Sequence, residues 1–275
     1  MAFRFDLRLF CRKLLLGGRD GARTLVSGIL DIVFPPFCRS CGTDMACPGM
    51  LCGSCADAVE WIGSACRCCG MPVLLAGDGP GCEACRGRRL AVDRIVAAGV
   101  HGGVLRRLVL LYKYQGERNL VRYLAGVLEK SWRTRLREVV ESGGLAVSEP
   151  ATEPEALLSG CGLVPVPGRR LGVLLRGRDP VLELTTVLAA RLDLPVLRIL
   201  KRRRRARPQV GLPREHRLRN QVNVFAVRRR ADIPSTAIIV DDVVTTCATV
   251  NDAARALRKV GVRRVFVLAV GRSGG

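Results

Sequence analysis

Residues 236–250 constrain the fold of this chain more than any other stretch, and they read Thr-Ala-Ile-Ile-Val-Asp-Asp-Val-Val-Thr-Thr-Cys-Ala-Thr-Val. A short, β-branched apolar run leads into Asp241 and Asp242 and then through small hydroxyl residues to a helical pattern that begins near Val250. Such a run is typical of a buried parallel strand. The sequence therefore predicts a strand, a tight loop and a helix N-terminus, with the acidic pair at the strand's carboxyl end.

The predicted loop has the chemistry of a phosphate site. A helix N-terminus presents unpaired backbone amides and the positive end of the helix dipole, and Thr245, Thr246 and Thr249 add hydroxyl donors. Open α/β sheets bind ligands at the carboxyl ends of their strands, where two carboxylates are suited to accept hydrogen bonds from vicinal hydroxyls. A sugar phosphate satisfies both halves.

The surrounding pattern indicates an α/β fold. Strands are predicted at 95–100, 163–167, 195–200 and 264–270, and helices at 104–114, 118–136, 180–192 and 251–260. A strand, a helix and a strand with short connections predict a right-handed βαβ unit and a parallel sheet. A loop is expected after Pro167, and it carries Arg169, Arg170, Arg176 and Arg178.

Four Cys-x-x-Cys pairs form the second strong signal. They supply eight thiolates, enough for two closed tetrahedral zinc sites, from Cys38, Cys41, Cys52, Cys55, Cys66, Cys69, Cys82 and Cys85. So few apolar residues lie between the pairs that this segment needs metal to fold. Redox-active dithiols are the alternative.

The zinc ligands can be grouped in two ways. Consecutive pairs give two ribbons in series, which we favour, and alternating pairs give a cross-brace. In either case a closed Cys₄ site has no open coordination position, so the metals are structural. Gly42 and Gly70 follow two of the pairs, where the turn is expected to need a positive φ.

The charge of the chain favours polyanionic partners. The formal net charge is +21, from 45 Lys and Arg against 24 Asp and Glu. An arginine-rich solvated surface without a specific role is the alternative. Residues 201–219 are the most basic run, and they could clamp a pyrophosphate, contact a nucleic-acid backbone or form a solvated loop. Lys113 could pair with phosphate or extend along its helix.

These patterns divide the chain into three domains. Residues 1–36 are expected to form basic amphipathic helices that pack on the same protein, with membrane or partner docking as alternatives. The ribbon segment covers 37–90, and an α/β domain covers 91–275 with an exposed inserted loop at 141–160. No secretory leader or membrane-spanning run is recognised among the apolar stretches, so we expect a cytoplasmic location, which suits thirteen cysteines.

The acidic loop resembles the PRPP-binding signature of type I phosphoribosyltransferases, a strand ending in Asp-Asp followed by Thr-Thr-Gly-x-Thr, with Cys247 in place of the glycine. The cysteine pairs, the Val-Pro-Val-Pro strand at 164–167, the basic loop with Gln209 and the acidic loop follow one another in this order. In this order, and in Lys113-Tyr114, the chain resembles the ComF family, a zinc-ribbon segment joined to a type I phosphoribosyltransferase-like domain.

This resemblance implies binding of PRPP with Mg²⁺ and a role in competence and the uptake of transforming DNA. Asp241 and Asp242 would hold the ribose, and Arg176 would hold the leaving group. The resemblance also implies a 5′-phosphate loop of Thr245, Thr246, Cys247, Ala248 and Thr249, and a basic clamp that includes Arg202, Arg204 and Gln209. Single-stranded DNA and DNA-uptake proteins are the implied macromolecular partners.

Two further departures from the family pattern lie on the phosphate side. Arg178-Asp179-Pro180 replaces the usual Phe-Asn-Gln after Arg176-Gly177, and Ala206 replaces a threonine. PRPP binding is therefore better supported than phosphoribosyl transfer. The alternative is a non-catalytic DNA-binding protein that uses the fold as a scaffold, with bases stacked on Tyr112, Tyr114, Tyr123 and Trp132.

Overall fold

The computed structural model describes residues 36–45, 49–66, 68–73, 82–85, 88–141, 160–203, 224–228 and 231–274. The chain divides into two compact units, Met1–Val59 and Glu60–Gly275. Apart from their boundary residues, the helices expected at 1–36 and the loop expected at 141–160 lie outside the described residues. Within the described residues, every helix is too short or too polar to cross a bilayer.

The first unit is described around its cysteine pairs. A turn follows Cys38, whose amide bonds to the Thr43 carbonyl at 2.8 Å. Gly42 has φ +79°, as the sequence predicts. The second pair leads into a short helix, α3 (Gly53–Asp57).

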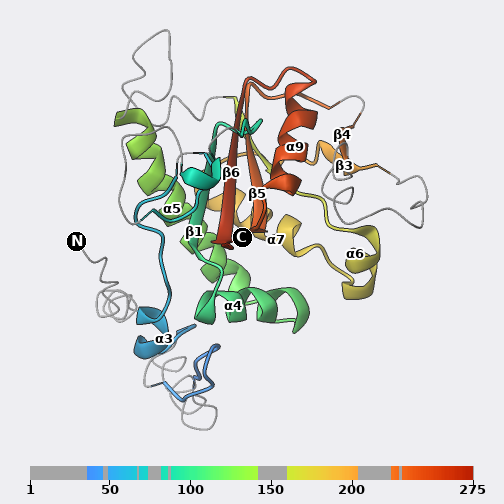
Figure 1. Cartoon of the computed structure of the whole chain (residues 1–275). Helices are drawn as coiled ribbons and strands as arrows, with labels where there is room; N and C mark the ends of the chain where they lie inside the picture. Colours follow the sequence, from blue (N-terminus) through green and yellow to red (C-terminus); the bar gives the residue numbers. More distant parts are fainter. Residues whose placement is uncertain are drawn as a thin grey trace, which may run out of the picture. The chain divides into compact units, whose positions relative to one another are not determined.

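The second unit contains a four-stranded sheet (Figure 1). Its strands are all parallel and lie in the order β1 (Arg94–Val100), β6 (Arg264–Arg272), β5 (Thr236–Val244) and β2 (Cys161–Pro165). β5 and β6 are central and almost wholly buried, which explains why both read as continuous apolar runs. The predicted α/β fold with a parallel sheet is confirmed.

Helices cover both faces of this sheet. Ala237 and Ile239 of β5 pack in one core cluster with α9 (Ala248–Arg258). Phe266, whose neighbour across the sheet is Ile238, meets Trp132 edge-on at 5.7 Å on the other face. Because neighbouring residues of a strand face opposite ways, α9 lies on one side and the other helices on the opposite side: α4 (Gly103–Tyr114), α5 (Leu120–Glu141) and α7 (Pro180–Leu192).

Helix α7 has the predicted limits, and its first turn explains why. Asp179 is the N-cap and accepts hydrogen bonds from the amides of Val181 at 3.2 Å and Leu182 at 3.3 Å. Pro180 occupies the first turn, where a missing amide hydrogen costs nothing. Asp179 and Pro180, which depart from the family pattern, therefore have a structural role at this helix start.

Two predicted segments differ from the structure. The loop expected after Pro167 contains a short helix, α6 (Arg170–Arg176), because Leu171, Leu174 and Leu175 belong to a run of helix-forming residues. The strand expected at 195–200 is wrong over most of its length, since within it only Val196 pairs with the parallel sheet, through a bridge to Leu163, and Leu200 already belongs to another strand.

The chain leaves the parallel sheet after this bridge. Leu200 begins β3 (Leu200–Arg202), which pairs antiparallel with β4 (Phe225–Val227). The β4 strand is held on α9 because the Phe225 amide donates to the buried Asp252 carboxylate at 3.0 Å. The apolar run at 195–200 predicted a strand. The distant contact between Phe225 and Asp252 positions β4, and through it decides which sheet β3 joins.

The second cysteine quartet belongs to the same unit as the sheet. Cys66, Cys69 and Cys85 share a core cluster with Ile95 of β1. Gly70 has φ +68°, and a Cβ there would lie 2.9 Å from the Ile95 carbonyl oxygen. The turn at Gly70 therefore approaches the backbone of β1 more closely than any residue other than glycine allows.

Candidate phosphate-binding site and zinc centres

The eight cysteines form two separate quartets. In each quartet all Sγ atoms lie within 4.8 Å of one another, and the quartets are Cys38, Cys41, Cys52 and Cys55, then Cys66, Cys69, Cys82 and Cys85. The Sγ–Sγ distance is 3.7 Å for Cys41–Cys52 and 3.6 Å for Cys69–Cys82. A tetrahedral zinc with Zn–S bonds of about 2.3 Å requires edges of about 3.8 Å. Both sets fit structural zinc, and the predicted pairing in series is confirmed.

Backbone amides prepare the second quartet for metal. Burial raises the pKa of the Cys66 thiol, but hydrogen bonds from the amides of Cys69 and Cys82 outweigh it and bring that pKa to about 6. The Cys82 amide lies 3.2 Å from Cys66 Sγ. Such amide donors orient and stabilise a thiolate ligand.

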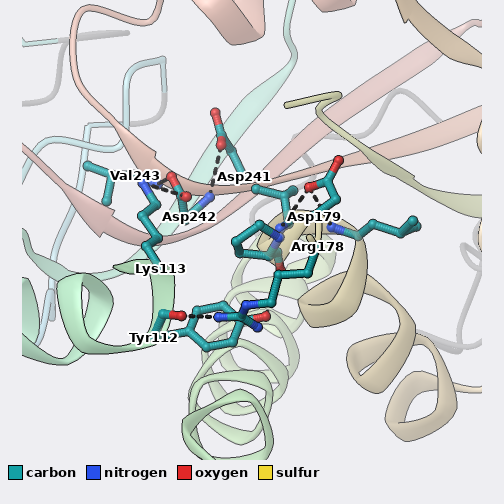
Figure 2. Close-up of polar contacts among 10 residues, drawn as sticks. Tyr112, Lys113, Arg178, Asp179, Asp241, Asp242 and Val243 are labelled. Carbon is teal, nitrogen blue, oxygen red and sulfur yellow. Dashed lines mark hydrogen bonds and ion pairs between the residues drawn. The ribbon is translucent and has the colours of Figure 1, made fainter. Parts of the chain in front are cut away.

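The acidic pair lies inside β5 rather than after it. Ladder pairing with β6 continues to Val244, so the strand is longer than its apolar run indicated. Asp241 and Asp242 are each 9% exposed. They point to different sides of the strand (Figure 2), Asp242 toward α4 and Asp241 on the face of Ile239.

Asp242 is paired with Lys113. Lys113 Nζ lies 2.5 Å from Asp242 Oδ2 (Figure 2). The Val243 amide donates to the other carboxylate oxygen at 2.7 Å. In this structure the partner of Lys113 is therefore a carboxylate of β5, and pairing of Lys113 with phosphate stays a prediction.

Among the described residues, no cation forms an ion pair with Asp241. Its Oδ1 accepts a hydrogen bond from the Asp242 amide at 2.9 Å. Burial raises the pKa of Asp241 well above its ordinary range, and the charge of Asp242 raises it further. A buried acid with a raised pKa at the ligand edge of an α/β sheet is a candidate functional group.

His101 is a neighbour of this edge that the sequence reading missed. It follows β1 directly, and its amide bonds to the Arg272 carbonyl at 2.9 Å. In the described structure its Nδ1 is buried without a hydrogen-bond partner. Burial lowers its pKa, and the positive charge of Lys113 lowers it further. Its place just after the strand predicted at 95–100 was the available signal.

The loop between β5 and α9 has the predicted form. Thr245, Thr246 and Thr249 are exposed. The amides of Thr249 and Val250, in the first turn of α9, have no hydrogen-bond partner among the described residues. These free donors and hydroxyls point to an anion site at the helix N-terminus.

Cys247 occupies the N-cap of α9 in a glycine-like conformation. Its φ is +63°, in the left-handed region that favours glycine. Its thiol is buried in the core, with Sγ 3.6 Å from an Arg272 nitrogen. Only the Cys247 backbone remains for a ligand.

The two arginines near α6 have different environments. Arg178 donates to the Tyr112 carbonyl and Glu183, and it stacks over the Tyr112 ring at 4.7 Å (Figure 2). Arg176 lies 5.7 Å from the Tyr114 ring, and its Nε is buried without a hydrogen-bond partner in the described structure. Tyr114 follows Lys113 in α4, so this helix links Arg176 with the acidic pair.

The remaining clamp residues are not brought to the acidic pair by any described contact. Arg202 Nε donates to the Pro167 carbonyl at 2.8 Å, and its guanidinium lies 4.8 Å from the Phe225 ring. Arg204 and Gln209 lie outside the described residues.

Most of the aromatic residues proposed for base stacking are covered. Tyr112 and Trp132 are buried in the core, and Tyr123 is partly buried. Tyr114 is 64% exposed. Of the four candidates, Tyr114 alone presents most of its ring to solvent.

The chain is similar to one known domain family and to one known protein. Residues 29–86 match the model of the double zinc ribbon domain family. The chain is 28% identical over 195 residues to Competence protein F of Haemophilus influenzae. That alignment covers 70% of this chain and 78% of the relative.

Proposed function

Because the chain belongs to the ComF family, we propose that the unit with the parallel sheet binds PRPP together with Mg²⁺ at residues 241–249. One observation carries the proposal. The buried pair Asp241 and Asp242 lies a few residues before the N-terminus of α9, where the amides of Thr249 and Val250 lack partners among the described residues. PRPP joins vicinal hydroxyls to a phosphate and so matches both features.

The loop and the start of α9 would hold the 5′-phosphate. The amides of Thr249 and Val250 and the hydroxyls of Thr245 and Thr246 are donors for its oxygens. The helix dipole favours the negative charge there. Cys247 and Ala248 would contribute backbone amides.

The acidic pair would accept hydrogen bonds from the ribose hydroxyls. In the free protein the charge of Asp242 is balanced by Lys113. When the sugar binds, Lys113 is free to turn toward the diphosphate, which carries more negative charge than one carboxylate. The same lysine thus serves the empty and the occupied site.

The diphosphate requires cations. Arg176 offers an Nε donor that is buried without a partner in the described structure. Arg202, Arg204 and Gln209 would extend this clamp, as the family resemblance implies. Mg²⁺ would neutralise the diphosphate, with Asp241 and Asp242 of β5 as candidate oxygen ligands. We propose binding and not transfer, because no described residue identifies an acceptor.

Isothermal calorimetry with PRPP and Mg²⁺ tests the proposal. We expect Asp241→Asn/Asp242→Asn to weaken binding at least about tenfold, since each lost charge-assisted contact contributes about 1.5–3 kcal/mol. Asp232→Asn, at an exposed aspartate, is the matched control and should bind as the wild type does. Absent binding in the wild type, or equal binding by the double variant, contradicts the proposal.

A second function, in DNA uptake, is favoured by the net charge of +21 and by the relative named Competence protein F. We propose that single-stranded DNA contacts the basic run at 201–219, with Tyr114 available for stacking. A mobility-shift titration should show affinity that falls steeply with salt. Saturating PRPP should displace the DNA. Changing Arg202, Arg204 and Arg205 to Ala should weaken DNA binding.

The outcomes of this titration separate two failures. If the wild type does not bind DNA at low salt, the DNA function fails. If it binds but PRPP and the three substitutions have no effect, the basic run is not the DNA site.

We further propose a cytoplasmic location and two structural zinc ions, because a reducing compartment keeps eight thiolates available for metal.

A further inference from the structure

Arg272, the last residue of β6, connects the second zinc centre with the phosphate loop. Its side chain is buried, with the residue 6% exposed. Nε donates to the carbonyl of the zinc ligand Cys69 at 2.8 Å. One terminal nitrogen donates to the carbonyls of Val244, at 3.1 Å, and Thr245, and the other lies 3.6 Å from Cys247 Sγ. The guanidinium thus contacts the zinc ligand Cys69, the end of β5 at Val244, and the loop residues Thr245 and Cys247.

The charge of Arg272 needs a partner. Among the described residues no carboxylate forms an ion pair with it, and all its named acceptors except a thiol are backbone carbonyls. An unpaired cation in a protein interior is costly. A zinc ion with four thiolates has a net charge of −2, since one divalent cation meets four anions. With zinc bound, the second centre, whose ligand Cys69 accepts a hydrogen bond from Arg272 at its carbonyl, would supply the negative charge that the buried arginine lacks.

The loop needs such a restraint. Cys247 has φ +63°, a conformation that a residue with a side chain rarely adopts. Strained conformations persist only when the surrounding structure holds them. The contacts from Arg272 to the Val244 and Thr245 carbonyls and to Cys247 provide this support on the core side of the loop.

We propose that the second zinc centre, acting through Arg272, holds residues 244–250 in the conformation that binds the phosphate. Arg272 is a positioning residue, because it lies on the core side of the loop and contacts carbonyls rather than the ligand-facing amides. Loss of this zinc removes the counter-charge and loosens the loop. The effect on PRPP affinity rests on the proposed function, whereas the effect on the loop does not.

The two quartets provide a matched pair of variants. Cys82→Ser removes one ligand from the second centre, and Cys52→Ser removes one ligand from the first centre, which belongs to the other compact unit. Hydrogen exchange of the full-length protein without PRPP, read by mass spectrometry, reports on the loop directly. We expect exchange of the hydrogen-bonded amides at the start of α9, those of Ala248 and Asn251, to rise at least about tenfold in Cys82→Ser and to stay unchanged in Cys52→Ser.

Arg272→Met tests the coupling without touching a ligand. We expect about the same acceleration at the amides of Ala248 and Asn251, with two zinc ions per chain still present by elemental analysis and with α7 (Pro180–Leu192) as protected as in the wild type. Unchanged loop exchange in Arg272→Met with full zinc content overturns the proposal. So does equal acceleration in Cys52→Ser and Cys82→Ser.

Calorimetry then separates this inference from the proposed function. If the wild type does not bind PRPP but Arg272→Met loosens the loop, the PRPP proposal fails and the coupling stands. If the wild type binds PRPP and Arg272→Met binds it equally well, the coupling to the ligand site is overturned and PRPP binding stands. We expect Arg272→Met to bind PRPP at least about tenfold more weakly than the wild type.

Discussion

The zinc-ribbon region and the carboxyl edge of the sheet use buried polar groups in opposite ways. In the ribbons the polar groups are matched: each thiolate has a place in a closed tetrahedral set, and amides donate to Cys66. At the sheet edge they are unmatched, with Asp241 buried at a raised pKa and His101 Nδ1 and Arg176 Nε without described partners. The first region has the features of a structural centre, and the second has the features of a candidate ligand site.

Removal of zinc should produce the largest change, since it destroys the matched region. Elemental analysis should give two zinc ions per chain, from the two quartets. Chelation should unfold the first unit and also lower the melting temperature of the second unit by about 10 °C or more, because Cys66, Cys69 and Cys85 share its core. Calorimetric melting before and after chelation measures this, and a second unit that melts at the same temperature would contradict it.

Two glycines at equivalent turns sharpen the comparison within the ribbons. Both have positive φ, but a Cβ on Gly70 would lie 2.9 Å from the Ile95 carbonyl, whereas a Cβ on Gly42 meets no atom within 4 Å. Gly42→Ala should cost only the strained backbone, about 1–2 kcal/mol. Gly70→Ala should cost about 3 kcal/mol or more, because the strand must also shift. Denaturant unfolding compares them, and equal losses would show that the contact with β1 is not restrictive.

At the sheet edge, Asp241→Asn should stabilise the protein by about 1 kcal/mol near neutral pH while it weakens ligand binding. Burial raises the folded-state pKa of Asp241, so the unfolded chain loses this proton first as pH rises above about 4. Wild-type stability therefore falls over that range until pH passes the folded-state pKa, and the asparagine variant lacks this loss.

Thermal melts of both proteins from pH 4 to pH 8 measure the difference. The gain from Asp241→Asn should be smallest near pH 4 and should grow as the pH rises. A gain that shrinks with rising pH, or a variant less stable than the wild type at pH 7, would mean that Asp241 contributes to stability rather than to function.

The sequence predicted the parts that depend on local patterns. The consecutive cysteine quartets, the parallel strands and the limits of α7 follow from spacing, apolar runs and the Asp179-Pro180 start. The errors arose where distant contacts decide. Asp252 holds β4 on α9, and its partner β3 leaves the parallel sheet, while pairing with β6 extends β5 past the acidic pair.

The site was predicted as a set of residues but not as an arrangement. No periodicity could indicate that Lys113 pairs with Asp242 or that Arg272 binds Cys69, since more than a hundred residues separate the members of each pair. The buried direction of the Cys247 side chain depends on the same contacts. These interactions are set by packing, whereas the residue types could be read from local sequence patterns.

The most direct test of the central claim is to locate where PRPP protects the protein. Hydrogen exchange of the full-length chain with Mg²⁺ is measured with and without saturating PRPP. PRPP should slow exchange about tenfold or more at the amides of 245–250, because this segment includes the free amide donors in the first turn of α9. Mg²⁺ with inorganic pyrophosphate is the control for a diphosphate alone. Protection at 245–250 by PRPP confirms the site, whereas protection confined to other segments, or none, contradicts it.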